Sequence, residues 1–293
     1  MPIRVRACAK VNLFLRVLGA RSDGYHDIET IFHGVSLCDE LAFAPRPTGV
    51  EIRTAPGARG VLPPVRDNLI ARAAQLFADQ AARRGVSVRV VKRIPVGGGL
   101  GGGSVDAAAT LVALNELWDL GLDAAGLSRA ATALGSDVAY FLAGGTVLAT
   151  GRGEKLLPIA SPAALWLVLG ISDVPLLTRD VYARWDKHRT RGPTSSALVD
   201  ALGRGDVSAV GARLHNDLEP AAISLRPELA AARDVLLDAG ALGAAVSGSG
   251  PTVFGLAGSE DHARSLAAAV SARFDAVEVV RGRTTSVEVL GGG

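Results

Sequence analysis

A dense run of glycines is the segment of this sequence best suited to chemistry. Residues 97–103 contain six glycines, and this run lies between an expected strand at 86–94 and an expected helix at 105–118. Glycine leaves the backbone N–H groups uncovered, and the start of a helix adds a partial positive charge. We therefore predict that this loop binds a polyphosphate. The alternative, a loop needed only for tight packing, would cost much chain entropy for no binding function.

Two common phosphate-binding motifs do not fit this loop. A Walker A loop ends in Gly-Lys followed by Ser or Thr, whereas here Gly103 and Ser104 are followed by Val105. Gly97, Gly99 and Gly102 match the dinucleotide pattern GxGxxG, but almost any run of glycines does. That fold also needs a second parallel strand after the helix, where residues 118–135 indicate a loop and another helix.

A candidate cation lies on an expected strand near the N-terminus. Residues 5–17 alternate between apolar and polar side chains, which predicts a half-buried strand. Side chains two positions apart share a face, so Lys10 and Asn12 should project together from the polar side. A lysine on such a face is equally compatible with a solvated surface.

The elements around these residues predict an α+β protein. Strands and helices are mixed without the regular alternation of a doubly wound sheet, and the first half indicates hairpins. A proline-containing segment at 157–162 precedes a new buried strand, so we expect two domains, 1–160 and 161–293.

Composition excludes several classes of protein. The 293 residues are 48% hydrophobic and 20% charged with a formal net charge of +2, so neither nucleic acid nor a membrane surface is an expected partner. We find no apolar run that could span a bilayer, and Arg4, Arg6 and Lys10 interrupt any signal sequence, so we expect a cytoplasmic protein. Cys8 and Cys38 are expected to be reduced thiols, and no metal-ligand spacing is present.

Four segments resemble the small-molecule kinase superfamily of galactokinase, homoserine kinase, mevalonate kinase and phosphomevalonate kinase. They are Ala-Lys-Val-Asn-Leu-Phe-Leu (9–15), the glycine segment 95–108, Leu-Gly-Ser-Asp-Val-Ala-Tyr-Phe (134–141) and Val-Ser-Gly-Ser-Gly-Pro-Thr-Val-Phe (246–254). Residues 10–32 and 67–74 are similar to the branch that phosphorylates 4-diphosphocytidyl-2-C-methyl-D-erythritol in non-mevalonate isoprenoid biosynthesis. The resemblance covers essentially the whole chain and is weakest between 175 and 215.

The resemblance implies a two-domain kinase with its active site in the cleft between the domains. It implies that ATP with Mg²⁺ phosphorylates the 2-hydroxyl of a small molecule carrying a cytidine diphosphate group. Lys10 and Asp137 match the catalytic lysine and aspartate, and Asn12, Tyr25, His26 and Tyr182 would bind the substrate. The nucleotide would be bound by Asn68, Pro95, Val96, Gly97, Gly98, Gly99, Leu100, Gly101, Gly102, Gly103, Ser104 and Val105.

Several of these residues also have simpler interpretations. Asp137, Asn68 and Ser104 each precede or begin an expected helix, where an N-cap is a common role. Tyr25 and His26 follow a turn and could lie on the surface, and the glycine turn at 247–251 could be a plain turn rather than a neighbour of the nucleotide loop.

The position of magnesium stays open on the sequence. The superfamily's loop often ends in two serines, but Ser104 here is followed by Val105, and Asp106 is an acid of the kind favoured in any first helical turn.

Two other functions stay open. One is a kinase of the same superfamily that acts on another alcohol, and the other is a nucleotide-binding sensor without turnover. The presence of both Lys10 and Asp137 argues against the sensor.

Overall fold

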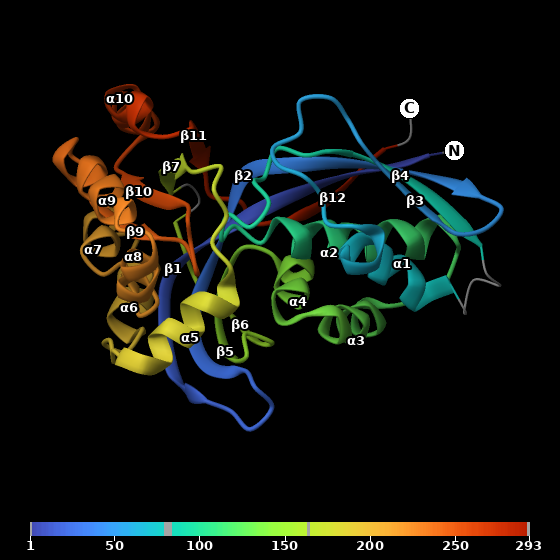
Figure 1. The fold of residues 1–293 in the computed structure, drawn as a ribbon, viewed down its shortest axis with the longest axis horizontal. Coiled ribbons are helices and arrows are strands. Elements are labelled where there is room, and N and C mark those ends of the chain that lie inside the picture. The colour runs from blue at the N-terminus through green and yellow to red at the C-terminus, as the bar shows by residue number, and fades with distance from the viewer. Residues whose placement is uncertain (1, 79–83, 163–164, 292–293) are drawn as a thin grey trace.

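Two long antiparallel strands run through the molecule (Figure 1). Strand β1 (Ile3–Ala20) and strand β2 (His26–Arg46) pair from Ile3–Phe43 to Ala20–His26. The computed structural model describes residues 2–78, 84–162 and 165–291. The β1–β2 register shifts at three points, between Cys8 and Lys10, Asn12 and Phe14, and Val17 and Gly19. Such irregularities bend a strand and re-aim its side chains, here on both sides of Lys10.

The first sheet has eight strands and draws on the whole length of the chain. Its main order is β12–β1–β2–β4–β3, while β5 pairs with β2 and β6, and β8 pairs with β1. The remaining strands of this sheet are β3 (Val50–Thr54), β4 (Gly85–Val91), β5 (Thr146–Gly151), β6 (Lys155–Pro158), β8 (His215–Asn216) and β12 (Val287–Leu290).

Helices α1 to α4 lie together beside this sheet (Figure 1). They are α1 (Leu69–Ala78), α2 (Gly102–Leu117), α3 (Ala124–Leu134) and α4 (Ser136–Ala143), with a short 3₁₀ helix at Val65–Asp67. Helix α2 packs on β1 and β2 and also against the other three helices. Its alanines at 107, 108, 109 and 113 are fully buried, and such small side chains allow close packing on several sides at once.

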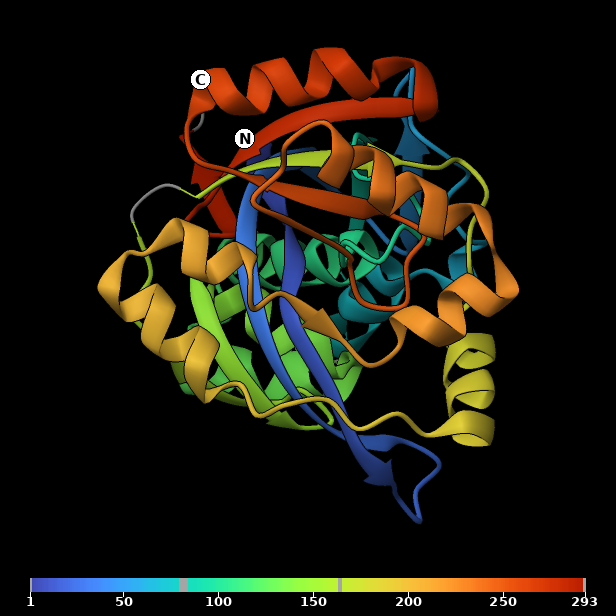
Figure 2. The ribbon, with the colours of Figure 1, turned by 90° about the vertical axis from the view of Figure 1, so that its left-hand side faces the viewer.

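The second sheet has four antiparallel strands in the order β11–β7–β10–β9 (Figure 2). They are β7 (Trp166–Ile171), β9 (Gly243–Val246), β10 (Val253–Ala257) and β11 (Ala276–Arg281). Helices α9 and α10 pack on these strands. The helices of this part are α5 (Thr178–His188), α6 (Ser196–Arg204), α7 (Val207–Gly211), α8 (Glu219–Leu225), α9 (Glu228–Asp238) and α10 (Glu260–Val270), with a 3₁₀ turn at Ser271–Arg273.

The predicted α+β architecture is confirmed. Strand pairs are antiparallel except β1–β8 and β3–β4, so the sheets are not built from repeated parallel crossover units. The division near residue 160 stays a prediction, and β8 and β12 return from the second half of the chain to pair with β1. Among the residues that the structure describes, the helices are too short or too polar to cross a membrane.

The prediction that residues 5–17 form a half-buried strand is wrong at the centre of β1. Every residue from 7 to 15 is buried, with Lys10 4% and Asn12 2% exposed. The glycine loop covers this face, and the Lys10 backbone N–H donates a hydrogen bond to the Leu100 carbonyl at 3.1 Å. Alternation along β1 could not reveal this cover because it comes from a distant segment.

The expectation of two separate thiols is also wrong. Cys8 on β1 and Cys38 on β2 are directly opposite each other and form a disulfide, with their Cα atoms 3.9 Å apart. The pairing depends on the β1–β2 register, which places the two residues opposite each other. The spacing of the two cysteines along the chain does not reveal that register.

Candidate active site

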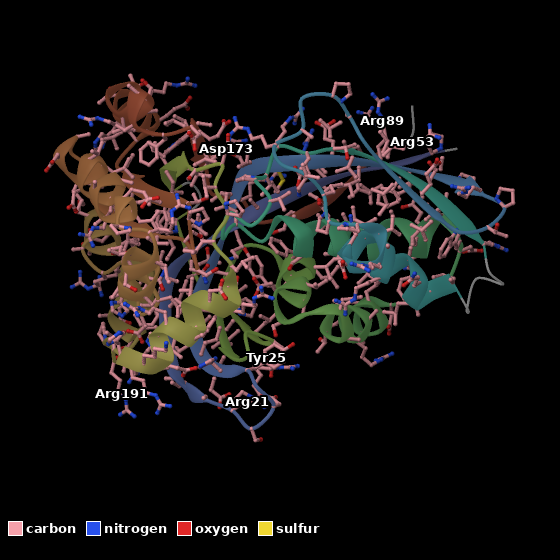
Figure 3. All side chains as sticks on the ribbon, in the orientation of Figure 1. Arg21, Tyr25, Arg53, Arg89, Asp173 and Arg191 are labelled. Carbon is pink, nitrogen blue, oxygen red and sulfur yellow. A yellow bond between two sulfur atoms is a disulfide. The ribbon has the colours of Figure 1, made fainter. Side chains whose placement is uncertain are left out.

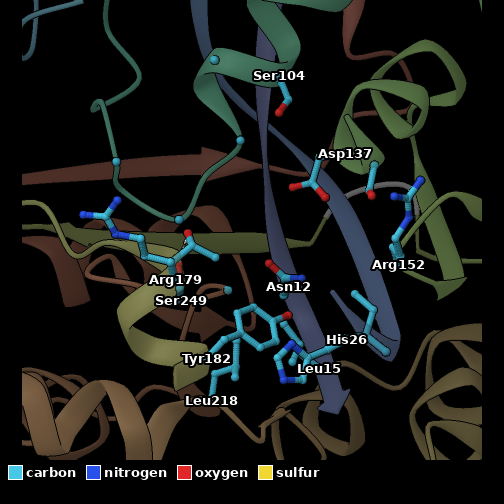
Figure 4. Close-up of a pocket in the computed structure, with 18 of the residues that line it drawn as sticks. Asn12, Leu15, His26, Ser104, Asp137, Arg152, Arg179, Tyr182, Leu218 and Ser249 are labelled. Carbon is cyan, nitrogen blue, oxygen red and sulfur yellow. Dashed lines mark hydrogen bonds between the residues drawn. The ribbon is translucent and has the colours of Figure 1, made fainter. Parts of the chain in front are cut away.

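A cavity of about 770 Å³ lies beside the glycine loop (Figure 4). Residues from both sides of position 160 line it, including Lys10 from β1, Tyr182 from α5 and Ser249 from the second glycine turn. Its size and mixed polar lining are typical of small-molecule sites. Of the predicted site residues, those that line it are Lys10, Asn12, Tyr25, His26, Pro95, Gly97, Gly98, Gly99, Gly101, Gly102, Gly103, Ser104, Asp137 and Tyr182.

The glycine loop requires glycine for its conformation and for its packing. Gly99 and Gly101 have φ angles of 76° and 74°, which residues with a Cβ rarely adopt. A Cβ on Gly99 would lie 2.2 Å from the Ser247 carbonyl oxygen, and one on Gly101 would lie 2.5 Å from the Phe141 ring. The Ser247 hydroxyl also donates to the Gly99 carbonyl at 3.0 Å, so the second glycine turn does lie against the loop.

The end of the loop forms the first turn of α2. The helix begins at Gly102, earlier than the expected Val105, and Gly101 occupies the N-cap position. The capping interpretation of Ser104 is therefore wrong, because Ser104 lies within the first turn. The first N–H groups of a helix have no partner inside it. Since Gly102, Gly103 and Ser104 all line the cavity, these donors are available to an anion there.

We expect Gly99→Ala to raise KM for ATP at least about tenfold. An alanine in the left-handed region costs about 1–2 kcal/mol, and its Cβ must also displace the 247–250 turn. Steady-state kinetics with varied ATP checks this prediction. Gly203→Ala is the control, because Gly203 lies in α6 and a Cβ there would meet nothing within 4 Å. An unchanged KM for Gly99→Ala would show that the loop does not bind the nucleotide.

The ammonium of Lys10 is held between the loop and a neighbouring amide. Its Nζ donates to the Asn12 Oδ1 at 2.6 Å and to the Gly99 carbonyl at 3.0 Å. Asn12 is oriented in turn, since its Nδ2 donates to the Thr30 hydroxyl at 2.8 Å. Burial lowers the pKa of Lys10, and the negative charge of Asp137 partly opposes that shift.

Asp137 lies in the first turn of α4, and its N-cap interpretation is wrong. Gly135 occupies the N-cap position, and within the described part of the chain the Asp137 carboxylate accepts no hydrogen bond. The Asp137 carboxylate (Figure 4) lines the cavity that Lys10 also lines, and its negative charge raises the pKa of Lys10. A free carboxylate and a buried ammonium thus share one space with the glycine loop.

Tyr25, His26 and Tyr182 form the aromatic side of the cavity. Tyr182 stacks on His26, with the ring centroids 4.6 Å apart and the planes inclined by 28°. Tyr25 follows the β1–β2 turn near Arg21 (Figure 3), is 55% exposed, and has the Arg152 guanidinium 4.9 Å from its ring centroid. The spacing of His26 and Tyr182 leaves no room for a base between them, so Tyr25 offers the more accessible ring.

Four predicted nucleotide-binding residues do not line the cavity. Leu100 and Val105 are buried in the core, so the loop turns its side chains inward and its glycines toward the cavity. Val96 is half-buried outside the lining. The Oδ1 of Asn68 accepts a hydrogen bond from the Ile70 N–H at 2.9 Å, which supports the interpretation of Asn68 as a helix cap for α1.

Asp106 belongs to a buried ionic cluster instead of the cavity. It accepts a hydrogen bond from Lys92 Nζ at 2.7 Å, and the same ammonium bonds to Asp39. The other oxygen of Asp39 accepts from the N–H groups of Arg93 and Ile94 at 2.6 and 2.9 Å. This cluster therefore ties the residues that follow β4 to the first part of α2, on either side of the glycine loop.

The charges inside this cluster shift one another. Burial raises the pKa of Asp106, and Asp39 adds to this shift while Lys92 opposes it. Burial alone would lower the pKa of Lys92, but the two carboxylates raise it above its usual value.

The cavity also contains residues that the sequence analysis missed. Arg152 follows β5 and Arg179 begins α5, and both add positive charge, while Asp186 adds a carboxylate. Arg152 lies in a turn and Arg179 in the first turn of α5, and isolated charged residues at such positions match no motif, so neither had a signal in the sequence. Asp186 lies four positions after Tyr182, and helical spacing could have placed both on one face of α5. Ser136 and Thr178 also belong to this group, whereas Ser249 lies in the 247–251 turn that the sequence had indicated as a possible neighbour of the nucleotide loop.

Comparison with known proteins identifies the family. Residues 68–145 match the family described as "GHMP kinases N terminal domain", and residues 198–276 match "GHMP kinases C terminal". The chain is 45% identical to the 4-diphosphocytidyl-2-C-methyl-D-erythritol kinase of Pelotomaculum thermopropionicum, over 92% of this chain and 93% of that protein. The chain belongs to the GHMP kinase family. This confirms the family resemblance and the kinase fold predicted from the sequence.

Further relatives place the chain within the GHMP kinases. It is 46% identical to the 4-diphosphocytidyl-2-C-methyl-D-erythritol kinase of Thermobifida fusca, over 92% of each protein. A crystal structure of 4-(cytidine 5'-diphospho)-2C-methyl-D-erythritol kinase matches with a TM-score of 0.79 and 36% identity, over 99% of this chain and all of that one. A homoserine kinase from Cytophaga hutchinsonii matches with a TM-score of 0.76 at 24% identity, which shows a shared fold.

Proposed function

We propose that this GHMP kinase transfers the γ-phosphoryl group of ATP to the 2-hydroxyl of 4-diphosphocytidyl-2-C-methyl-D-erythritol, in the non-mevalonate route to isoprenoid precursors. The observation that carries the proposal is that Lys10, Asp137 and the glycine loop line one cavity. Phosphoryl transfer needs positioning and charge stabilisation more than covalent help, and these three features supply both. The acceptor follows from the names of relatives 45% and 46% identical to the chain.

The glycine loop would bind the triphosphate of ATP. The free N–H groups at the N-terminus of α2 would donate hydrogen bonds to the phosphate oxygens. The Ser104 side chain lies in the same helical turn and also lines the cavity. The loop carries no formal charge of its own, and the cations that line the cavity with it are Lys10, Arg152 and Arg179.

The reacting groups would meet between Lys10 and Asp137. The acceptor hydroxyl oxygen forms a bond to the γ-phosphorus as the bond from that phosphorus to the β–γ bridging oxygen breaks. Asp137 orients the hydroxyl and receives its proton, and the Lys10 ammonium stabilises the negative charge on the phosphoryl oxygens. Asn12 holds Lys10 in place through its Oδ1.

Mg²⁺ would be bound mainly through the phosphates and water. Among the described residues no cluster of three or more His, Cys, Asp or Glu side chains is arranged to hold a metal ion. The cavity offers oxygen ligands from Asp137 and Ser104, which fits a cation that keeps several waters and takes few protein ligands. Bound there, Mg²⁺ would neutralise part of the phosphate charge.

A comparative assay tests the function. We expect ATP-dependent ADP release with the cytidine-bearing substrate, and little release with homoserine or mevalonate. Preference for homoserine or mevalonate would assign another acceptor, and ATP binding without ADP release in any of these mixtures would assign a sensor.

The division into domains 1–160 and 161–293 and the cytoplasmic location stay predictions.

Tyr25 would stack on the cytosine of the substrate. We expect Tyr25→Ala to weaken substrate binding by about 1–3 kcal/mol, the usual worth of a lost base–aromatic stack. Tyr25→Phe keeps the ring and should bind nearly as well as the wild type. Titration of the substrate into each variant checks this, and equal affinities for all three proteins would place the base elsewhere.

A further inference from the structure

The His26 side chain packs against one face of helix α5. Tyr182, Trp185 and Asp186 follow helical spacing, so they lie on the same side of α5. Tyr182 stacks on the His26 ring. Trp185 contacts the same ring in an edge-to-face arrangement, with the ring centroids 5.8 Å apart and the planes at 89°. Asp186 Oδ1 lies 3.0 Å from His26 Nε2. Three contacts thus restrict the position and rotation of one imidazole at the edge of the cavity.

The contact with Asp186 also decides which ring nitrogen can accept a hydrogen bond. A carboxylate only accepts, so Nε2 of His26 must carry the hydrogen that joins them. In the neutral ring, Nδ1 is then an acceptor. Within the described part of the chain, Nδ1 has no hydrogen-bond partner, and His26 lines the cavity. The nitrogen left for a ligand is therefore an acceptor.

We propose that Asp186 is a positioning residue that holds His26 as a hydrogen-bond acceptor and thereby makes the site prefer cytosine to uracil. The proposal rests on the proposed function, because it concerns the base of the same substrate. Cytosine presents an amino group at the position where uracil presents a carbonyl oxygen. An acceptor at Nδ1 can bind the amino group but repels the carbonyl. A site built in this way rejects the wrong base because one of its polar groups would remain unpaired.

The first test compares substrates that differ only in the base. Wild-type protein should have a kcat/KM at least about tenfold higher for the cytidine substrate than for its uridine analogue. In Asp186→Leu the ring can carry its hydrogen on Nδ1 and donate to a carbonyl, so this ratio should fall toward one, mainly through KM. Asp186→Glu, which can still reach Nε2, should restore part of the ratio. A ratio unchanged by Asp186→Leu would overturn the proposal.

The second test does not depend on catalysis. Spectra of protein with ¹⁵N-labelled histidine should show hydrogen on Nε2 of His26 in the wild type and a shift toward Nδ1 in Asp186→Leu. The His26→Gln variant assigns the signal. Asp180→Asn, on the same helix but outside the cavity lining, is the control and should change neither the spectrum nor the base preference.

The two tests separate the possible failures. If the wild type phosphorylates neither substrate, the proposed function fails while the nitrogen spectra still decide the state of His26. If the wild type is active and His26 carries its hydrogen on Nδ1, the proposal about Asp186 fails alone.

Discussion

Asp137→Asn should lower kcat by about two or more orders of magnitude while ATP and substrate still bind. The asparagine has nearly the same shape as the aspartate but cannot receive the proton of the attacking hydroxyl, and general-base groups contribute about 10²–10⁴ in rate. The fold should survive, because the Asp137 side chain makes no hydrogen bond to any described residue and does not cap α4. Turnover assays together with calorimetric titration of each ligand separate the rate effect from binding.

The same substitution should change the response of the residual activity to pH. The Asp137 charge raises the pKa of Lys10 against the larger effect of burial, so its loss lowers that pKa further. A lysine with a lower pKa loses its proton at lower pH, so the variant's remaining activity should decline earlier than that of the wild type as pH rises. Asp238→Asn, on the exposed end of α9, should leave rate and pH profile as they are. Wild-type turnover in Asp137→Asn would remove Asp137 from the chemistry.

Lys92→Met should destabilise the protein by about 3–5 kcal/mol, the usual cost of removing one partner from a buried ion pair. Methionine fills a similar volume but leaves Asp39 and Asp106 buried without a cation. Because domains are stable by only about 5–15 kcal/mol in total, this loss should lower the melting temperature markedly. Denaturant unfolding of both proteins measures the difference. Lys187→Met, at an exposed site on α5, should change stability by no more than about 0.5 kcal/mol.

The effect of Lys92→Met should depend on pH in a defined direction. Burial and the charge of Asp39 raise the pKa of Asp106, and without the ammonium of Lys92 nothing in the cluster opposes that rise above the value in the unfolded chain. Acids with raised pKa values destabilise the folded state increasingly as pH rises through that range. The free-energy difference between variant and wild type should therefore be larger at pH 8 than at pH 5. Equal stability of the two proteins at both pH values would mean that the cluster does not hold the fold.

Local features could be read from the sequence wherever the physical cause is local. The glycine loop could be located because the strand, the run of glycines and the helix that define it are consecutive in the sequence. The pairing of Lys10 with Asn12 followed from the two-residue period of a strand, and their side chains do meet at 2.6 Å. The start of α1 after Asn68 followed from the capping preference of asparagine.

Tertiary structure decided everything that depends on contacts between distant segments. The glycine loop buries Lys10, and this burial lowers the pKa of its ammonium. The β1–β2 register brings Cys8 and Cys38 together in a disulfide. Asp106 pairs with Lys92 in the core instead of lining the cavity. Asp186 reaches His26 only because α5 packs against the start of β2. Periodicity and capping describe a residue's immediate neighbours in the chain, whereas burial, charge pairing and the lining of a cavity depend on which distant surfaces meet.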